Sequence, residues 1–512
     1  MKYEIVIYGG TPAGISSAIS SARLNKKVII VEPNSHIGGM MTSGLGKCDI
    51  EEKKLAGGIF LEYVKNVYNY YKNKYGIDST NLKLCKNGYY SEPSVSEYIL
   101  EKMLKVEKNI EVYKEWHLNT VNEVNLKLKY ITIKNTKSNS IKEIYGDIFI
   151  DASYEGDLYS KCNIKYRVGR ESKTEYNEKH AGEIYYDYNS KTILEGTTGK
   201  GDNRLPAYTY RLCLSTNKNN SIKINKPPFD YTRENYLEYF NDLKFGRLSG
   251  PKVYKPGRGY NKDHFDTMFR ALSVTNIPNY KTDVNINPRP LGFIFAEENS
   301  EYINGDSKQR HKICLKIKNL TLGLLWFLQN DPEIPKEHKI IANKYNLPLD
   351  EFIDNEHFPF QLYIREGRRL VGEYTLTEND VTKQNNIKYK KFNDNIAVGE
   401  FPIDSFPCQK KQNNNNQVLE GYLCMLDHIT IPYEIPFRIM LPQNYNDLIV
   451  PVAASTSHIA FSSIRMEPTW MALGQAAGTA ASLALDNNIS MKDLPIDLLQ
   501  KSLLKQNQVI NL

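Results

Sequence analysis

A turn of small residues lies close to the start of the chain, and a single carboxylate follows it. An apolar run at residues 3–8 ends at this turn, a second apolar run at 27–31 ends at Glu32, and Glu32 lies 18 positions after the last glycine of the turn. This spacing is typical of a dinucleotide site: the turn admits a pyrophosphate, the helix after it offers unpaired N–H groups, and the carboxylate reaches a ribose hydroxyl. We therefore predict cofactor contacts from Gly9, Gly10, Thr11, Pro12, Ala13, Gly14 and Glu32.

The elements that must position these residues are a strand, a helix and a second strand. Residues 3–8 predict a buried strand, 15–24 a helix of small residues, and 27–31 a second buried strand. Thr11 stands where the GxGxxG pattern has its middle glycine, which affects how closely a phosphate can approach. Glu32 disfavours a cofactor with a 2′-phosphate, because two negative groups would meet there.

A second glycine-rich loop follows directly after Glu32, over residues 34–46. It resembles the GG-containing segment with which FAD enzymes of the glutathione-reductase-like class line the flavin, a segment that nicotinamide-only proteins usually lack. This resemblance favours flavin over NAD as the resident cofactor. It adds seven residues to the predicted cofactor site: Gly38, Gly39, Met40, Met41, Thr42, Gly44 and Gly46.

Two further segments, far apart along the chain, complete the predicted site. An apolar strand ends at Ala152 and Ser153, where two-domain flavoproteins close a small-residue turn over the adenosine half of FAD. Near the C-terminus, another apolar run and a polar turn lead to Arg465 and Met466. A helix of small residues is predicted from about 469 to 486, and its N-terminal dipole can stabilise negative charge on a reduced flavin.

Six sequence segments together resemble one known family. They are GGTPAGISSA, GGMMTSGLG, IDASYEGDL, QLYIREGRRLVGEY, IPYEIPFRIMLP and PVAASTSHIAFSSIRMEPTWMALGQAAGTAA. The resemblance is to the FAD-dependent oxidoreductases of the xanthan-lyase-associated type. It implies a bound FAD, a redox reaction and an α/β fold, in which a Rossmann-like FAD-binding domain of the glutathione-reductase-like class carries a large inserted α+β substrate or cap domain. The substrates of this family are largely unassigned, so the resemblance specifies the cofactor better than the reaction.

On this basis the chain divides into four parts. The first part of the FAD-binding domain covers residues 1–165, and its second part covers 410–490. Residues 166–409 form the inserted substrate or cap region, which should cover the flavin. Residues 491–512 should form a C-terminal helix on the surface.

His458 and Arg369 are the candidates for the reacting side chains. His458 lies in the turn after the last strand of the FAD-binding domain, where strand ends present ligand sites, and an imidazole can move a proton. The alternative for His458 is a capping or packing role. Arg365 and Arg369 lie one turn apart if residues 363–374 form a helix, and paired guanidiniums suit an anionic substrate or the FAD pyrophosphate. The alternative is a structural helix with salt bridges to its own glutamates.

The predicted reaction is the dehydrogenation of a small organic substrate by hydride transfer to flavin N5. A flavin-dependent monooxygenase that uses NAD(P)H and O₂ is one alternative, a tRNA-modifying flavoprotein is a second, and a non-catalytic flavin-binding protein is a third. The sequence has no second strand-GxGxxG-helix unit after residue 46 and no CxxxxC motif. Electrons should therefore leave through O₂, a quinone, a partner protein or a transiently bound NAD(P).

Composition limits the partners and the location. The 512-residue chain is 41% apolar and 24% charged, which is ordinary for a globular protein, and its net charge of +7 is dispersed rather than gathered into a nucleic-acid-binding patch. Its seven cysteines form no CxxC pair, so we expect no metal site and a reducing compartment. No signal peptide is apparent, and no apolar run reaches the roughly 20 residues of a membrane span. We expect a cytoplasmic protein with a small-molecule substrate, no nucleic-acid partner and no membrane, and the oligomeric state stays open.

Overall fold

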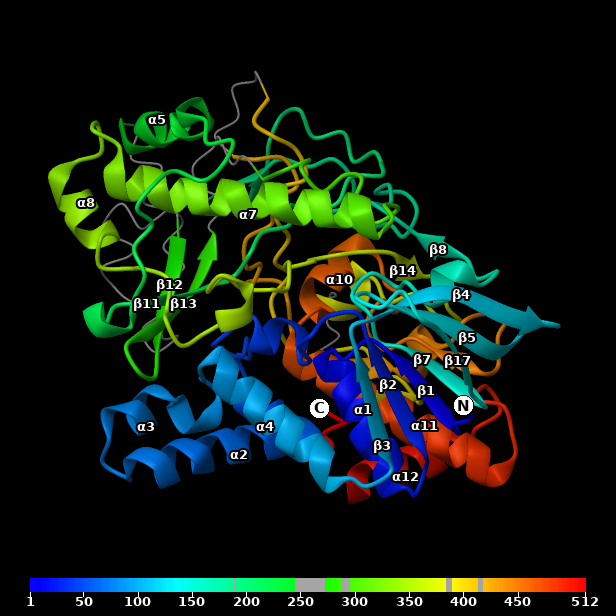
Figure 1. The fold of residues 1–512 in the computed structure, drawn as a ribbon. Coiled ribbons are helices and arrows are strands. Elements are labelled where there is room, and N and C mark those ends of the chain that lie inside the picture. The colour runs from blue at the N-terminus through cyan, green and yellow to red at the C-terminus, as the bar shows by residue number, and fades with distance from the viewer. Residues whose placement is uncertain (188–189, 245–271, 287–294, 384–388, 413–417) are drawn as a thin grey trace.

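A parallel sheet forms the centre of the fold. The computed structural model describes the whole chain except residues 188–189, 245–271, 287–294, 384–388 and 413–417. Five strands pair in parallel in the order β17-β7-β1-β2-β3 (Figure 1). They are β1 (Ile5–Tyr8), β2 (Val28–Glu32), β3 (Ile110–Lys114), β7 (Ile148–Asp151) and β17 (Leu448–Ile449). The predicted α/β fold with strands from both ends of the sequence is therefore confirmed.

Helices α1 (Pro12–Arg23) and α11 (Glu467–Asn487) pack side by side against this sheet (Figure 1). A Cβ on Gly474 would lie 2.2 Å from the Ala13 carbonyl oxygen, so the two backbones are almost in contact. Serine hydroxyls of α1 donate three hydrogen bonds to backbone carbonyls of α11: Ser16 to Met471, Ser17 to Gly474 and Ser21 to Gly478. The contacts advance together along both helices, so the helices run parallel. Both N-termini therefore lie at the carboxyl end of the strands.

Three antiparallel strands cover the other face of the parallel sheet. They are β4 (Trp116–Val124), β5 (Lys127–Asn135) and β6 (Ile141–Tyr145), in the order β4-β5-β6. Ile131 of β5 belongs to the same core cluster as Val6 and Phe149 of the parallel strands. Side chains alternate along a strand, so Ile5 and Ile7 point the other way, into the core shared with α1 and α11. Both faces of the sheet are buried, as its unbroken apolar strands require.

Further helices surround this core. Between β2 and β3 the chain forms α2 (Gly58–Tyr75), α3 (Thr80–Leu84) and α4 (Pro93–Val106). The terminal helix α12 (Ile496–Lys505) lies against α11, with Leu499 and Leu503 buried. Within the described ranges, none of the helices combines the length and the apolar character that a bilayer span needs.

The middle of the chain adds a mixed region beside the parallel sheet (Figure 1). Its antiparallel sheet has the order β11-β13-β12, with β11 (Leu212–Ser215), β12 (Leu272–Ile277) and β13 (Lys281–Ile286). Its helices are α5 (Glu238–Lys244), α7 (Ser307–Asn330), α8 (Lys336–Ala342) and α9 (Glu378–Val381). Short strands pair as β8 (Tyr166–Arg167) with β14 (Arg369–Leu370), β9 (Tyr186–Asp187) with β10 (Thr192–Ile193), and β15 (Asn395–Gly399) with β16 (Tyr433–Pro436). Helix α10 (His458–Ile464) precedes α11.

The helix predicted for residues 363–374 is wrong. This segment contains no helix, and β14 within it pairs with β8. The segment is buried along most of its length, and its three arginines bind groups in different directions: Arg365 the Ala207 carbonyl, Arg368 the Asp157 carboxylate and Arg369 the Glu171 carboxylate. An isolated surface helix could present those arginines on one side only. The tertiary partners therefore override the local helical spacing.

Candidate functional site

The turn after β1 joins the ends of three elements. Gly9 has a φ of 105°, which a residue with a side chain rarely adopts, and it leads the chain from β1 into α1. The Thr11 hydroxyl donates to the Ala152 carbonyl at 2.7 Å and accepts from the Gly14 N–H at 3.2 Å. Thr11 therefore caps α1 and ties it to the end of β7, which a glycine at this position could not do.

Very close backbone contacts surround this turn. A Cβ on Gly14 would lie 2.0 Å from the Gly9 carbonyl oxygen, so α1 can approach β1 only because residue 14 has no side chain. The Gly10 N–H donates to Glu32 Oε2 at 2.7 Å. The Gly10 carbonyl accepts from the Gly38 N–H at 2.6 Å. The two glycine-rich loops predicted from the sequence therefore lie against each other.

Glu32 is buried at the end of β2, with 6% of its surface exposed. Its Oε1 accepts from the Asn34 N–H at 2.8 Å. Burial raises the pKa of this carboxyl to about 7, and the two backbone N–H donors oppose the shift. The carboxylate thus lies at the carboxyl end of β2 beside the first turn, which is where a dinucleotide fold places the ribose.

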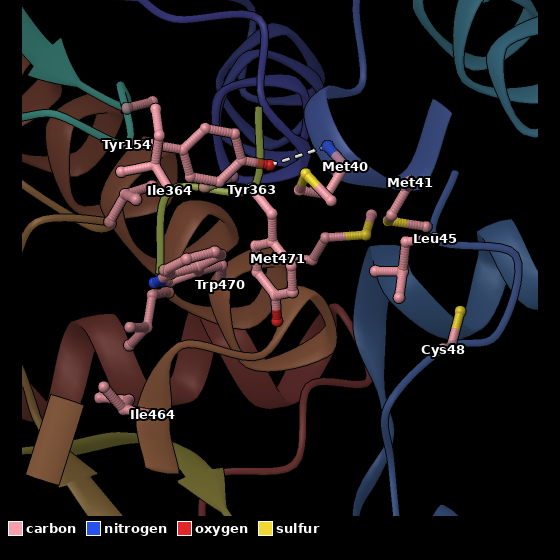
Figure 2. Close-up of a cluster of buried hydrophobic side chains, with 14 of the residues drawn as sticks. Met40, Met41, Leu45, Cys48, Tyr154, Tyr363, Ile364, Ile464, Trp470 and Met471 are labelled. Carbon is pink, nitrogen blue, oxygen red and sulfur yellow. Dashed lines mark hydrogen bonds between the residues drawn. The ribbon is translucent and has the colours of Figure 1, made fainter. Parts of the chain in front are cut away.

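Tyr154 connects the second glycine loop to the start of α11 (Figure 2). Its hydroxyl accepts from the Met40 N–H at 3.1 Å and donates to Glu467 Oε1 at 2.7 Å. A Cβ on Gly39 would lie 2.3 Å from the same hydroxyl oxygen, so this position requires glycine. The sequence interpretation missed both Tyr154 and Glu467 as site residues. The available signal for Tyr154 was its position directly after the predicted site residue Ser153.

Apolar side chains form a buried cluster around Tyr154, between the glycine loop and α11 (Figure 2). Its members include Met40, Met41, Leu45, Tyr154, Tyr363, Trp470 and Met471. Two buried polar atoms here, Glu467 Oε2 and Trp470 Nε1, have no hydrogen-bond partner among the described residues. Burial raises the pKa of Glu467 to about 8, because the charged form loses its hydration. The start of α11 therefore presents one unsatisfied carboxyl oxygen and one unsatisfied N–H.

The rest of the second glycine loop contacts the middle region of the chain. Residues Gly39–Thr42 form one 3-10 turn. Gly44 has a φ of 106°, and a Cβ there would lie 1.9 Å from the Arg211 carbonyl oxygen, next to β11. A Cβ on Gly46 would lie 2.9 Å from Ile277 Cδ1, at the end of β12. The loop therefore lies between the parallel sheet and the antiparallel sheet of the middle region.

The turn after β7 is held by its own hydrogen bonds and by arginines. Asp151 Oδ1 accepts from the Ser153 N–H at 3.0 Å and from its hydroxyl at 2.6 Å. Asp157 binds Arg310 at 2.6 Å and Arg368 at 3.0 Å. These two ion pairs fix the loop that contains Asp157.

His458 is the first residue of α10, and its surface is only 3% exposed. Its Nδ1 lies 2.7 Å from Glu366 Oε2, and its backbone N–H donates to Glu171 Oε2 at 2.9 Å. The other ring nitrogen, Nε2, lies 3.4 Å from the Ser405 hydroxyl. Glu366 therefore orients the ring from the Nδ1 side, and Nε2 faces the Ser405 hydroxyl.

Arg369 binds both carboxylates that hold His458. Its guanidinium lies 2.7 Å from Glu171 Oε1 and 2.9 Å from Glu366 Oε1, and it also donates to the Thr456 carbonyl at 2.8 Å. The side chain is completely buried. Arg369 therefore binds the same two carboxylates, Glu171 and Glu366, that contact His458.

Arg465 and Met466 lie directly before α11, and Met466 is the residue that caps it. Arg465 donates to the Tyr363 hydroxyl at 2.7 Å and to the Asp404 carbonyl at 2.7 Å. Glu467, two residues further along the chain, binds Tyr154.

Glu178 is a buried carboxylate beside His458. It accepts from the Ser457 hydroxyl at 2.5 Å and from the Glu378 N–H at 2.6 Å. Its Oε2 has no hydrogen-bond partner among the described residues. Burial, reinforced by the charges of Glu378 and Glu171, raises its pKa from 4.5 to about 7.

This shift predicts that Glu178 makes the protein less stable as the pH rises from about 4.5 to about 7. In that window the folded protein keeps a proton on Glu178 that the unfolded chain releases, so the free energy of unfolding falls with pH. Glu178→Gln carries no such proton and should show a shallower fall. Urea unfolding of both proteins between about pH 5 and pH 7 measures the difference, and equal slopes would contradict the raised pKa.

The described ranges contain free thiols but no cluster of side chains suited to a metal ion. The seven cysteines are all free, and no group of three or more His, Cys, Asp or Glu side chains within those ranges could hold a metal ion.

Comparison with solved structures gives distant likenesses. A geranylgeranyl bacteriochlorophyll reductase-like protein from Thermoplasma acidophilum covers 99% of this chain and 84% of its own, at 10% identity and a TM-score of 0.38. The myxobacterial chondrochloren halogenase CndH, described as a variant of FAD-dependent halogenases, covers 98% and 78%, at 9% identity and a TM-score of 0.38. L-proline dehydrogenase from P. horikoshii covers 38% of this chain, and the match spans only 26% of its own length, at 13% identity and a TM-score of 0.19. At such TM-scores these neighbours identify neither a reaction nor a substrate. No curated protein matches the chain.

One comparison covers nearly the whole chain. The family model described as FAD dependent oxidoreductase matches residues 4–503, from β1 to α12. It agrees with the resemblance carried by the six sequence segments, and the finer xanthan-lyase-associated type stays a prediction. The chain therefore belongs to the FAD-dependent oxidoreductase family, and the protein is an enzyme that uses FAD as its cofactor.

Proposed function

We propose that this enzyme dehydrogenates a small organic substrate in a site between a glutathione-reductase-like FAD domain and an inserted cap. The FAD domain would consist of residues 1–165 and 410–490, and the cap of 166–409. The observation that carries the proposal is the parallel packing of α1 against α11, which brings two helix N-termini to the carboxyl end of the parallel sheet. Helix N-termini at this edge bind anionic groups.

The chain's own residues fit FAD along its length. The α1 N-terminus with Gly9, Gly10 and Gly14 would hold the pyrophosphate, and Glu32 would hold the ribose. The flavin would lie at residues 38–46 and at the start of α11. The unsatisfied Glu467 Oε2 and Trp470 Nε1 support that assignment, because a flavin ring carries both hydrogen-bond donors and acceptors on its edges.

FAD, when bound, supplies an acceptor for two electrons in the form of a hydride. The protein must then orient the substrate, exclude water and take up a proton. We propose that His458 Nε2 accepts the proton that the substrate loses, since Glu366 holds Nδ1 and stabilises the ring in one orientation. Arg369 would hold Glu366 and Glu171 in place. Gly44 lies against the backbone of Arg211, the residue directly before β11 of the middle region. This close contact supports a cap that covers residues 38–46.

The cofactor and the reaction can be tested on the purified protein. We expect a visible flavin spectrum, and acid precipitation should release a molecule with the mass of FAD. Alcohols and other reduced organic compounds are then added without oxygen, and bleaching of the flavin by one of them supports dehydrogenation. O₂, a quinone or NAD(P) would then be tested as the acceptor that restores the spectrum. Bleaching by NAD(P)H alone, followed by a hydroxylated product in air, would favour a monooxygenase, and salt-sensitive tRNA binding would favour an RNA-modifying enzyme.

His458→Gln is expected to slow substrate-driven flavin bleaching by about 10²- to 10⁴-fold, because the proton acceptor is lost. The flavin content should stay unchanged, since His458 contacts Glu366 and Ser405 rather than the glycine turns. His311, which is exposed on α7, provides the matched control, and His311→Gln should bleach at the normal rate. A His458→Gln enzyme as fast as the wild type would exclude this histidine from the proton transfer.

A further inference from the structure

Arg365 is buried between two aromatic rings. Its surface is only 1% exposed. The central carbon of its guanidinium lies 3.4 Å from the centre of the Phe406 ring and 4.3 Å from the centre of the Tyr363 ring. Rings on the guanidinium faces leave the planar edge, where all five N–H groups lie, as the direction of hydrogen bonding.

The positive charge of Arg365 has no negative partner in the part of the chain that the structure describes. Nη1 donates to the Ala207 carbonyl at 2.8 Å, and Nη2 donates to Asn285 Oδ1 at 3.3 Å. Nε is buried and has no hydrogen-bond partner there. Burial lowers the pKa of Arg365 to about 9, and the charges of Arg465 and Arg211 add to this effect, which Tyr363 and Asp404 oppose only in part.

The other buried arginines show that this arrangement is exceptional. Within the described ranges six arginines are buried, and five of them have a carboxylate oxygen within 4.0 Å: Arg170, Arg211, Arg368, Arg369 and Arg465. Arg365 is the sixth, and no ion pair is found for it. A buried charge without a partner lowers the stability of the folded protein. When a ligand of opposite charge binds to it, the new ion pair offsets that loss.

The location of Arg365 points to the substrate rather than to the FAD pyrophosphate. Phe406 follows Ser405, whose hydroxyl lies 3.4 Å from His458 Nε2. Tyr363 is bound by Arg465, directly before α11. Asn285 belongs to β13 of the middle region. Arg365 therefore lies among the residues proposed for proton transfer, flavin contact and the cap, and none of its contacts involves the glycine turns at the start of α1.

We infer that Arg365 binds the carboxylate of the substrate, so that the enzyme acts on small organic acids. The inference rests on the proposed function, because it uses the same site. A carboxylate can take two parallel hydrogen bonds from one guanidinium edge, and the aromatic rings fix the plane of that edge. The carbon to be oxidised would then be held at a fixed distance from the anchored carboxylate.

Calorimetric titration with benzoate and with its neutral analogue benzamide tests the inference on the purified protein. Wild-type protein should bind benzoate and not benzamide. Arg365→Met should weaken benzoate binding by about 10- to 100-fold, as expected for the loss of charged hydrogen bonds, and Arg365→Lys should retain part of it. Equal binding of the two compounds, or benzoate binding that Arg365→Met leaves unchanged, would overturn the inference.

Stability separates an anion-binding role from a structural one. Without added anion, Arg365→Met should unfold at the same urea concentration as the wild type or a higher one, because it removes a charge without a partner. A clearly lower unfolding midpoint would show that Arg365 is structural and would overturn the inference. Flavin content is measured on every sample. Protein without flavin would contradict the proposed function. Protein that contains flavin but does not bind benzoate would contradict only the proposal that Arg365 binds a carboxylate.

Discussion

Gly14→Ala should yield a protein that no longer retains FAD. The added methyl carbon would lie 2.0 Å from the Gly9 carbonyl oxygen, far inside van der Waals contact, and no side-chain rotation can separate a Cβ from a backbone oxygen. Helix α1 must then move away from β1, and its N-terminus leaves the position where it can bind a pyrophosphate. Overpacking of this kind costs roughly 1–3 kcal/mol or more, which corresponds to about a 10- to 100-fold loss of affinity.

Flavin absorbance relative to protein absorbance measures this effect directly. Gly76→Ala is the matched control, because Gly76 ends α2 and a Cβ there would meet no atom within 4 Å. The control carries the cost of a positive φ but should keep its FAD. Gly14→Ala protein with a full complement of FAD would show that α1 does not hold the phosphates.

Arg369→Met should lower the free energy of unfolding by about 3–5 kcal/mol. The substitution leaves Glu366 without Arg369 and leaves Glu171 with only Arg167, at 3.9 Å, as an arginine partner among the described residues. Both carboxylates have less than 6% of their surface exposed. The loss of a buried charge partner is expensive because the remaining charge cannot regain its hydration. His458 should also lose its fixed orientation, since Glu366 and Glu171 both bind it.

Urea unfolding measures the first effect, and flavin bleaching by substrate measures the second. Arg438→Met is the control: Arg438 binds Asp394 at 2.8 Å, but its side chain is 47% exposed, so the expected loss is below about 1 kcal/mol. A conservative Arg369→Lys variant should recover part of the stability and of the bleaching rate. If Arg369→Met were as stable as Arg438→Met, the ion pairs of Arg369 would not anchor this site.

The cofactor end of the site could be predicted because its chemistry is local. A strand, a turn of small residues, a helix and a second strand that ends in an acid lie within the first 32 residues, and each part has a steric or hydrogen-bonding reason of its own. Gly9 and Gly14 must lack side chains, and Glu32 must end its strand. The hydrogen bond by which Thr11 ties α1 to the end of β7 could not be predicted in this way, because its acceptor, the Ala152 carbonyl, lies 141 positions away.

The segment that contains the three arginines shows where local pattern fails. Residues 363–374 have the spacing of a helix, but their partners come from distant parts of the chain. Glu171 lies 198 positions from Arg369, and Asp157 lies 211 positions from Arg368. Buried ion pairs decide the backbone conformation here, because an unpaired buried charge costs more than the weak helical preference of a short segment gains.

Residue types and short-range spacing were thus enough to predict the α/β fold and the first glycine turn, whereas FAD as the cofactor came from the resemblance of several segments to flavin enzymes. Only the folded chain shows that Tyr154 joins Met40 to Glu467, that Glu366 orients His458, and that Arg365 forms no ion pair with any carboxylate of the described residues. The reason is physical. Turns, caps and strand ends are set by steric limits within a few residues. The partner of a buried polar group depends instead on which distant segments pack together, and spacing along the chain does not predict that packing.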